Sequence, residues 1–165
     1  MLKIVTIPNP KLRERSKELD RDVVLTDEIQ ELAKEMIPIM YQADGVGLAA
    51  PQVEKNIRIC TISKEAMKKD KKNTLSTNDD LVLINPVWNK LSRKTGWDTE
   101  GCLSVPKTYG KVKRYTEIHV QALGINGNLL SFDAHNFFAR VIQHEVDHLD
   151  GILFIDKAKD IYTVE

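Results

Sequence analysis

The stretch FFARVIQHEVDHLDG, which begins at Phe137, constrains the fold and the chemistry of this chain more than any other. Apolar residues recur in it at spacings of three and four, which predicts a helix with one buried face. On such a helix Val141, His144 and His148 line up with Phe137. Two histidines four apart, with Glu145 beside the first, form the pattern H-E-x-x-H, in which both imidazoles can bind one metal ion.

Glu145 is adjacent to His144 and therefore points to a neighbouring edge of the predicted helix. From there its carboxylate can reach a water molecule on the ion without binding the ion, which is the position of a general base. The alternative is that these are ordinary polar residues of a helix, because a single histidine on a buried face is usually a core residue with a hydrogen-bonded partner. Two histidines at this spacing beside an acid favour a metal site.

A catalytic site of this kind takes three protein ligands and keeps one position for water, so the stretch lacks a third ligand. No histidine follows His148. The acidic residues that follow it are Asp150, Asp156, Asp160 and Glu165. Upstream, Cys102 lies in DTEGCLSVP, and its thiolate would suit zinc or ferrous iron. We favour Cys102, and the alternatives are Cys60, in the strand-like segment IRICTIS, and a carboxylate near the C-terminus.

Two other classes of protein share parts of this pattern. A general metalloprotease also uses H-E-x-x-H, but it takes a histidine or glutamate further along the chain as its third ligand. A structural zinc module closes its site with four protein ligands, and only three are apparent here. The sequence therefore favours a catalytic metal site that is completed by Cys102.

Composition narrows the class of protein further. Lys and Arg together number 24, as do Asp and Glu, so the net charge is zero, whereas proteins that bind nucleic acid or anionic membranes usually carry a basic excess. No apolar run approaches the ~20 residues of a membrane span, and the segment MLKIVTIPNPKL has neither the apolar region nor the Arg/Ser-rich pattern of a targeting leader. We expect one complete cytoplasmic domain of 165 residues, with no direct nucleic-acid binding and no membrane attachment.

The first half of the chain predicts one long helix followed by strands. Thr26 is a candidate N-cap for a helix with an apolar stripe that extends to Met40, and Pro38 within it should kink the helix or end it early. Segments 57–63 and 81–86 are typical of strands, and the final proline of the second should end it.

The remaining segments indicate the fold class. Segment 64–80 is polar and lysine-rich, which predicts a solvated, flexible loop. Glu117–Phe132 is typical of a hairpin around Asn126-Gly127. Strands that follow one another through turns favour antiparallel pairing. The predicted class is α+β, with mainly antiparallel β-sheets around a central α-helix that carries H-E-x-x-H.

Three segments together resemble the peptide deformylase family. GVGLAAPQ (45–52) fits the family pattern G-x-G-[LI]-A-A-x-Q, EGCLS (100–104) fits E-G-C-L-S, and QHEVDH (143–148) fits Q-H-E-x-D-H. The segments occur in the family's order, and the similarity extends from IVTIPNPKLR to Asp156. One departure is Lys107, where the family often has glycine.

The resemblance implies a metal centre with defined roles. The implied ligands are Cys102, His144 and His148. They would bind one divalent ion, with ferrous iron expected and zinc, nickel or cobalt suited to the same ligands. Glu145 would be the general base and acid. The side-chain amide of Gln52 and the backbone N–H of Leu103 would stabilise the oxyanion.

The resemblance also implies a reaction and a partner. The family hydrolyses the formyl group of N-formylmethionyl peptides and releases formate, with a water molecule on the ion attacking the formyl carbonyl. The substrates would be newly made polypeptides that begin with formylmethionine. Such substrates imply transient proximity to the ribosome.

Residues beside the motifs are candidates for binding the substrate. In the family the neighbourhood of Gly47 contacts the substrate peptide. The candidates for an apolar pocket around the methionine side chain are Val46, Phe137, Phe138 and Val141. Core packing is an equally good explanation for any one of these four. Arg140 could border the substrate, and Arg114 could pair with Asp147 to brace the helix.

Overall fold

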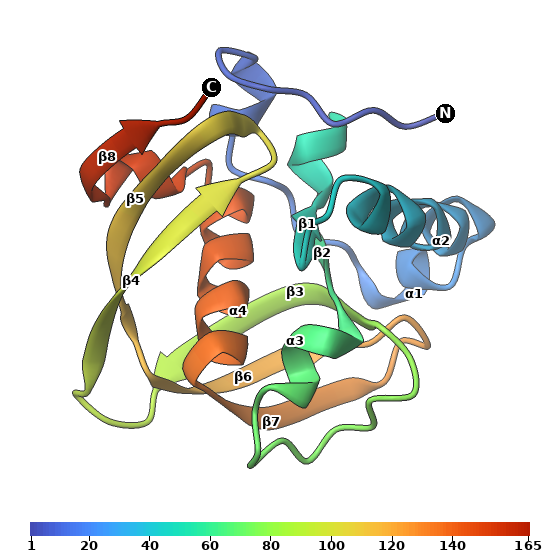
Figure 1. Cartoon of the computed structure of the whole chain (residues 1–165). Helices are drawn as coiled ribbons and strands as arrows, with labels where there is room; N and C mark the ends of the chain where they lie inside the picture. The colour runs from blue at the N-terminus through green and yellow to red at the C-terminus, as the bar shows by residue number, and fades with distance from the viewer.

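Two antiparallel sheets and the helices packed between and beside them make up the computed structural model, which describes residues 1–165 (Figure 1). The α-helices are α1 (Arg21–Val24), α2 (Asp27–Gln42), α3 (Lys64–Lys68) and α4 (Asn136–Leu149). The 3-10 helices are η1 (Pro10–Arg13), η2 (Ala50–Val53) and η3 (Phe154–Asp156). The strands are β1 (Gly47–Ala49), β2 (Ile59–Ile62), β3 (Leu81–Lys90), β4 (Thr95–Cys102), β5 (Val105–Tyr115), β6 (Glu117–Leu123), β7 (Leu129–His135) and β8 (Lys159–Thr163).

The strands form a five-stranded sheet in the order β1-β2-β3-β6-β7 and a three-stranded sheet in the order β4-β5-β8. Every neighbouring pair is antiparallel, so the predicted α+β class with mainly antiparallel pairing is confirmed. None of the helices has the length and the apolar character that a membrane crossing requires.

Helix α4 lies between the two sheets (Figure 1). Phe138, Ile142 and Leu149 form its fully buried stripe and belong to the largest apolar cluster, together with residues of β2, β3, β6 and β7. The ring of Phe138 stacks on that of Phe132 in β7, with 5.9 Å between the centroids. Because this stripe anchors α4 to the five-stranded sheet, the next row of side chains, which includes His144, faces the space beside the smaller sheet.

The predicted hairpin is present as β6 and β7. Leu123 pairs with Leu129 at its closed end, and Gly127 has a φ of 79°. This left-handed conformation costs little at glycine and explains why the Asn-Gly pair is a reliable turn signal.

Pro38 does not end helix α2, which runs on to Gln42, so the prediction of an early end is wrong. Proline removes one backbone donor from a helix interior. Pro38 lies on the exposed side, where water can satisfy the carbonyl left without a partner, while Met36 and Met40 are fully buried on the opposite side. Packing of the buried stripe therefore outweighs the loss of one hydrogen bond.

Pro86 does not end its strand either, because β3 continues to Lys90. The pairing of β3 with β6 shifts register between Ile84 and Val87, and Asn85 there has a φ of 51°. The proline thus occupies an irregularity where no ladder donor is needed, and the strand resumes beyond it.

The segment between β2 and β3 is not the fully solvated loop that its composition predicts. It opens with helix α3, where Ser63 accepts a hydrogen bond from the N–H of Ala66 as an N-cap. Ala66 and Met67 are buried in the main cluster. The buried carboxylate of Asp70 accepts a hydrogen bond from the backbone N–H of His135. Two apolar residues and one acid therefore anchor a segment that is otherwise polar.

We expect Gly151→Ala to destabilise the protein by about 2–3 kcal/mol. Gly151 follows α4 with a φ of 75°, and a Cβ atom there would lie 2.5 Å from the carbonyl oxygen of Arg13. Thermal and urea unfolding measure the effect. Gly96→Ala is the control, because the nearest atom to a Cβ there is Thr116 Cγ2 at 3.5 Å, and it should change stability by no more than about 0.5 kcal/mol. Equal effects of the two changes would contradict the explanation.

Candidate metal centre

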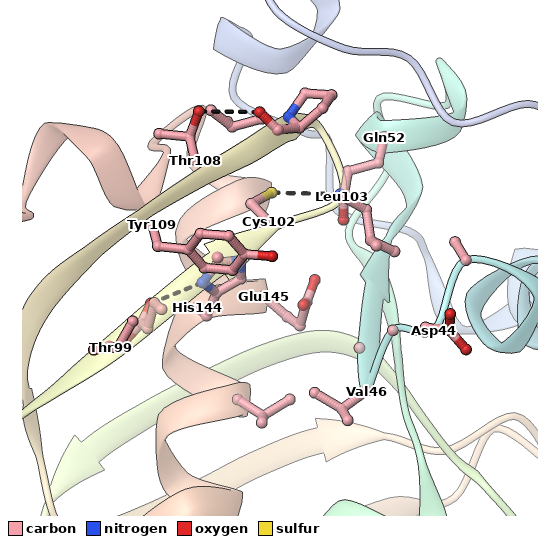
Figure 2. A pocket seen from close by; sticks show the side chains of 18 of the residues that line it. Asp44, Val46, Gln52, Thr99, Cys102, Leu103, Thr108, Tyr109, His144 and Glu145 are labelled. Atoms are coloured by element: carbon pink, nitrogen blue, oxygen red, sulfur yellow. Dashed lines mark hydrogen bonds and ion pairs between the residues drawn. The ribbon is translucent and has the colours of Figure 1, made fainter. Parts of the chain in front are cut away.

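Cys102, His144 and His148 come together although they are distant in sequence. Cys102 is the last residue of β4, whereas both histidines are on α4. One ligand atom from each residue lies within 4.8 Å of the others, and Cys102 Sγ is 3.2 Å from His148 Nε2. Figure 2 shows Cys102 and His144 beside the same cavity. One thiolate and two imidazoles are a donor set that zinc and ferrous iron both accept.

The histidines are held in a form that suits metal binding. His144 Nδ1 lies 2.8 Å from a Glu100 carboxylate oxygen, and because a carboxylate can only accept, this nitrogen donates and Nε2 is the atom available to an ion. Burial opposes protonation of His144, but hydrogen bonds with Cys102 and Glu100 raise its pKa to about 10, so an ion at Nε2 would displace a proton. His148 is 1% exposed, and burial lowers its pKa, so its imidazole is neutral at neutral pH. Its Nδ1 is buried without a hydrogen-bond partner. The chemistry of the donor set therefore fits a divalent ion.

The alternative third ligands lie elsewhere. Cys60 is fully buried in β2 among apolar side chains. Asp150 pairs with Arg58 at 3.0 Å, and Asp156 pairs with Arg13. None of the three belongs to the group formed by Cys102 and the two histidines.

Glu145 lines the cavity together with Cys102 and His144 and is only 4% exposed. Burial raises its pKa to about 7, although His144 acts in the opposite direction. Its Oε2 atom is buried without a hydrogen-bond partner. A Cβ atom on Gly47 would lie 2.6 Å from its Oε1, so only glycine lets β1 approach this carboxylate so closely. Glu145 is thus a buried acid whose pKa suits proton transfer near neutral pH.

Gln52 is held with its amide nitrogen towards Cys102. Its Oε1 accepts a hydrogen bond from the N–H of Ala49 at 2.9 Å. Its Nε2 donates to Ser104 Oγ at 3.0 Å and lies 3.8 Å from Cys102 Sγ. Leu103, the other predicted oxyanion residue, lines the same cavity. The structure therefore brings the GVGLAAPQ and EGCLS segments to one site.

Glu100 is a central residue of the site to which sequence reasoning assigned no role. Its buried carboxylate accepts two hydrogen bonds from Arg114 at 2.9 Å and one from Arg140 at 2.7 Å, in addition to the bond from His144. Burial opposes its ionisation, but the bonds from Arg114 and His144 outweigh burial and hold the pKa of Glu100 well below its usual range. The sequence did contain one signal for Glu100: residues two apart on a strand share a face, and Cys102 lies two positions after Glu100 in β4.

The predicted pair between Arg114 and Asp147 is confirmed at 2.6 Å. Lys157 also binds Asp147, at 3.0 Å. Arg140 lines the cavity as predicted, but its guanidinium also donates to Glu100 and to the carbonyls of Val112 and Gly96. The hydrogen bonds of the Arg140 guanidinium are therefore made within the protein, to Glu100 and to two backbone carbonyls.

The cavity has a volume of about 490 Å³. Of the five substrate-binding candidates that are apolar residues or glycine, four line it. These are Val46, Gly47, Phe137 and Val141. Phe138 does not line it, because it is fully buried against the larger sheet, so that prediction is wrong. Lys107 and Tyr109 also line the cavity, and Lys107 has a left-handed φ of 57°, a conformation that costs least at glycine.

Comparison with known proteins gives a consistent picture. The family model described as "Polypeptide deformylase" matches residues 1–163. A relative named "Peptide deformylase 2" from Gloeobacter violaceus is 40% identical over 159 residues, which cover 96% of this chain and 80% of the relative. The structure of peptide deformylase from Thermotoga maritima has a TM-score of 0.84 and 31% identity, over 96% of this chain and 98% of that one. A Met-Ala-Ser-bound peptide deformylase from Acinetobacter baumannii has a TM-score of 0.83 and 29% identity, over 95% and 98%.

We expect Glu100→Gln to destabilise the protein by about 3–5 kcal/mol, because it leaves the guanidinium of Arg140 without an anionic partner and that of Arg114 with Asp147 alone. Urea unfolding at neutral pH measures the loss. Glu31→Gln is the control, since Glu31 forms only an exposed pair with Lys34 at 3.6 Å and should contribute at most about 0.5 kcal/mol. If both substitutions change stability equally, the buried network does not have the proposed importance.

Cys102→Ser should weaken metal retention by at least about tenfold, because a neutral hydroxyl replaces a thiolate ligand. Metal content after dialysis against a graded series of chelator concentrations measures the effect. Cys60→Ala tests the alternative cysteine and should leave metal content unchanged. Loss of metal in the Cys60 variant alone would reverse the assignment.

Proposed function

Since the chain belongs to the polypeptide deformylase family, we propose that it removes the formyl group from N-terminal formylmethionine of new polypeptides through the centre formed by Cys102, His144 and His148. The observation that carries the proposal is the convergence of these three ligand atoms with Glu145 and Gln52 on one cavity. The products would be formate and a peptide with a free methionine amine.

The three ligands would hold one divalent ion, which when bound polarises the formyl carbonyl and lowers the pKa of a water molecule. Ferrous iron is the proposed native ion, and zinc, nickel and cobalt accept the same donors. Glu100 supports the site by orienting His144 through Nδ1. Arg114 and Asp147 extend this support from β5 to α4.

Glu145 would move the proton. Its buried carboxylate borders the cavity, and its free Oε2 atom can accept a proton from the attacking water. The same group can then donate that proton to the amine nitrogen as the C–N bond of the formamide breaks. A pKa of about 7 lets one carboxyl group serve in both steps near neutral pH.

Gln52 and Leu103 would stabilise the negative charge that develops on the formyl oxygen. The Gln52 amide is already oriented by Ala49 and Ser104, so little reorganisation is needed when charge appears. The second donor would be the backbone N–H of Leu103. Removing one such donor typically costs about 10²–10³ in turnover.

The methionine side chain would occupy the apolar wall formed by Val46, Phe137 and Val141. Strand β1 is the edge strand of its sheet and passes next to Glu145, so a peptide backbone can pair with it while its N-terminus points at the metal centre. The bound Met-Ala-Ser in the Acinetobacter baumannii relative is a peptide of the expected kind. We propose that this takes place in the cytoplasm, in transient proximity to the ribosome.

Glu145→Gln should keep the metal but lose about 10²–10⁴ of its turnover, because the amide cannot accept and return a proton. Formate release from formyl-Met-Ala measures turnover, and metal analysis on the same anaerobic sample measures retention. Glu35→Gln, on the exposed side of α2, is a control for the charge change and should leave both unchanged.

Two results would contradict the proposal. Full activity of the Glu145→Gln variant would remove Glu145 from its role. Cleavage of internal peptide bonds in unblocked proteins, with no formate from formyl-Met-Ala, would instead identify a general metalloprotease.

A further inference from the structure

A second cavity, which we call the basic cavity, shares no lining residue with the metal-centre cavity. It is lined by Trp88, Lys90, Arg93, Thr95, Lys113, Arg114, Tyr115, Gln143 and Lys157. Its volume is about 440 Å³, which is within the usual size of small-molecule sites. Five of its nine lining residues are cationic, and none is acidic.

Three of the five cations have no anionic partner in the protein. Lys90, Arg93 and Lys113 take part in none of the ion pairs of the structure. All three are exposed; the Nζ of Lys90 lies beside the cavity residue Tyr115, whereas the Nζ of Lys113 lies 5.8 Å from the ring centroid of Trp97, outside the cavity. This clustering is unexpected in a chain with equal numbers of basic and acidic residues.

The other two cations are partly compensated. Arg114 bonds to Glu100 and Asp147, and Lys157 bonds to the same Asp147. Only two of the five cations therefore contact carboxylates, and one of these carboxylates, Glu100, is shared with Arg140 as well. An excess of at least three positive charges surrounds the cavity.

Such an excess favours a ligand that carries several negative charges. Like charges at short range repel one another, and a concave surface lined by one sign of charge concentrates ions of the opposite sign. Guanidinium and ammonium groups together are typical partners of phosphate, because arginine binds two oxygens at once and lysine acts as a point charge.

The aromatic wall adds a second type of contact. The rings of Trp88 and Tyr115 are half-buried and lie 5.8 Å apart, tilted by 57°. Lys90 Nζ lies 5.4 Å from the Tyr115 ring centroid, so cationic and aromatic groups are interleaved. Aromatic rings stack on nucleobases irrespective of their sequence identity.

We propose that the basic cavity binds a phosphate-bearing ligand, and that a nucleoside diphosphate fits it best because its phosphates meet the cations while its base meets the aromatic wall. This site is separate from the metal centre, and the proposal does not depend on the deformylase activity. Binding can therefore be tested in the metal-loaded protein without any activity assay.

Trp88 serves as a built-in reporter. The chain has two tryptophans, and Trp97→Phe removes the one outside the cavity. In this background we expect ADP to change Trp88 fluorescence saturably and to raise the melting temperature. Pyrophosphate is tested alongside ADP to separate recognition of a nucleotide from recognition of phosphate alone. Tighter binding of ADP identifies the nucleotide as the ligand, whereas equal binding of the two identifies phosphate alone. Either result supports a phosphate site in the cavity.

Arg93→Ala and Lys113→Ala should each weaken binding by about tenfold, since each removes a charged partner without breaking an ion pair of the protein. Lys94→Ala is the matched control, because Lys94 is exposed next to Arg93 but does not line the cavity, and it should change affinity by less than about twofold. Circular dichroism verifies folding of each variant. No saturable response at millimolar ligand, or equal weakening by the Lys94 control, would overturn the proposal.

Discussion

The buried carboxylate of Glu100 is the interaction on which the rest of the site depends. An ionised carboxylate that is 7% exposed is tolerable only when its oxygens are paired. Arg114 approaches from β5, and Arg140 and His144 approach from α4, so one residue of β4 joins three elements. The position of α4 against the smaller sheet is therefore set by charge, while its position against the larger sheet is set by apolar packing.

This arrangement determines which atoms are free for chemistry. Because Glu100 accepts a hydrogen bond from His144 Nδ1, the other ring nitrogen faces Cys102, which lies two residues further along β4. The helical spacing then brings His148 to the same point, 3.2 Å from the sulfur. Glu145, adjacent in sequence, is displaced around the helix and borders the cavity without joining the ligand group. The three candidate ligands and the buried acid beside them thus come from one hairpin and one helix.

Local patterns and the family resemblance predicted the helix, the hairpin and the grouping around Cys102, but they missed several effects of tertiary packing. The helix at 136–149, the hairpin at Gly127 and the ligand triplet all follow from spacing or from the resemblance. Pro38 and Pro86 were misinterpreted because buried packing and a register shift, which are tertiary features, override the local effect of proline. Glu100 was passed over for the same reason: its importance arises from partners that lie 14 to 44 residues away.

The net charge of the chain was also a poor guide to the local distribution of charge in the folded protein. A net charge of zero argued against partners that are polyanions, but an average says nothing about where charges lie. Residues 90–114 contain seven basic and two acidic side chains, so this one stretch has a charge of +5 and the remainder of the chain balances it. Folding of β4 against β5 then concentrates several of these cations around one cavity. Arg114 belongs both to this cavity and to the Glu100 network, so the same residue that neutralises the buried acid also leaves the outer cations without a carboxylate of their own. The hydrogen-bond network that braces the candidate metal centre therefore uses the carboxylates of Glu100 and Asp147 and leaves Lys90, Arg93 and Lys113 without an ion pair.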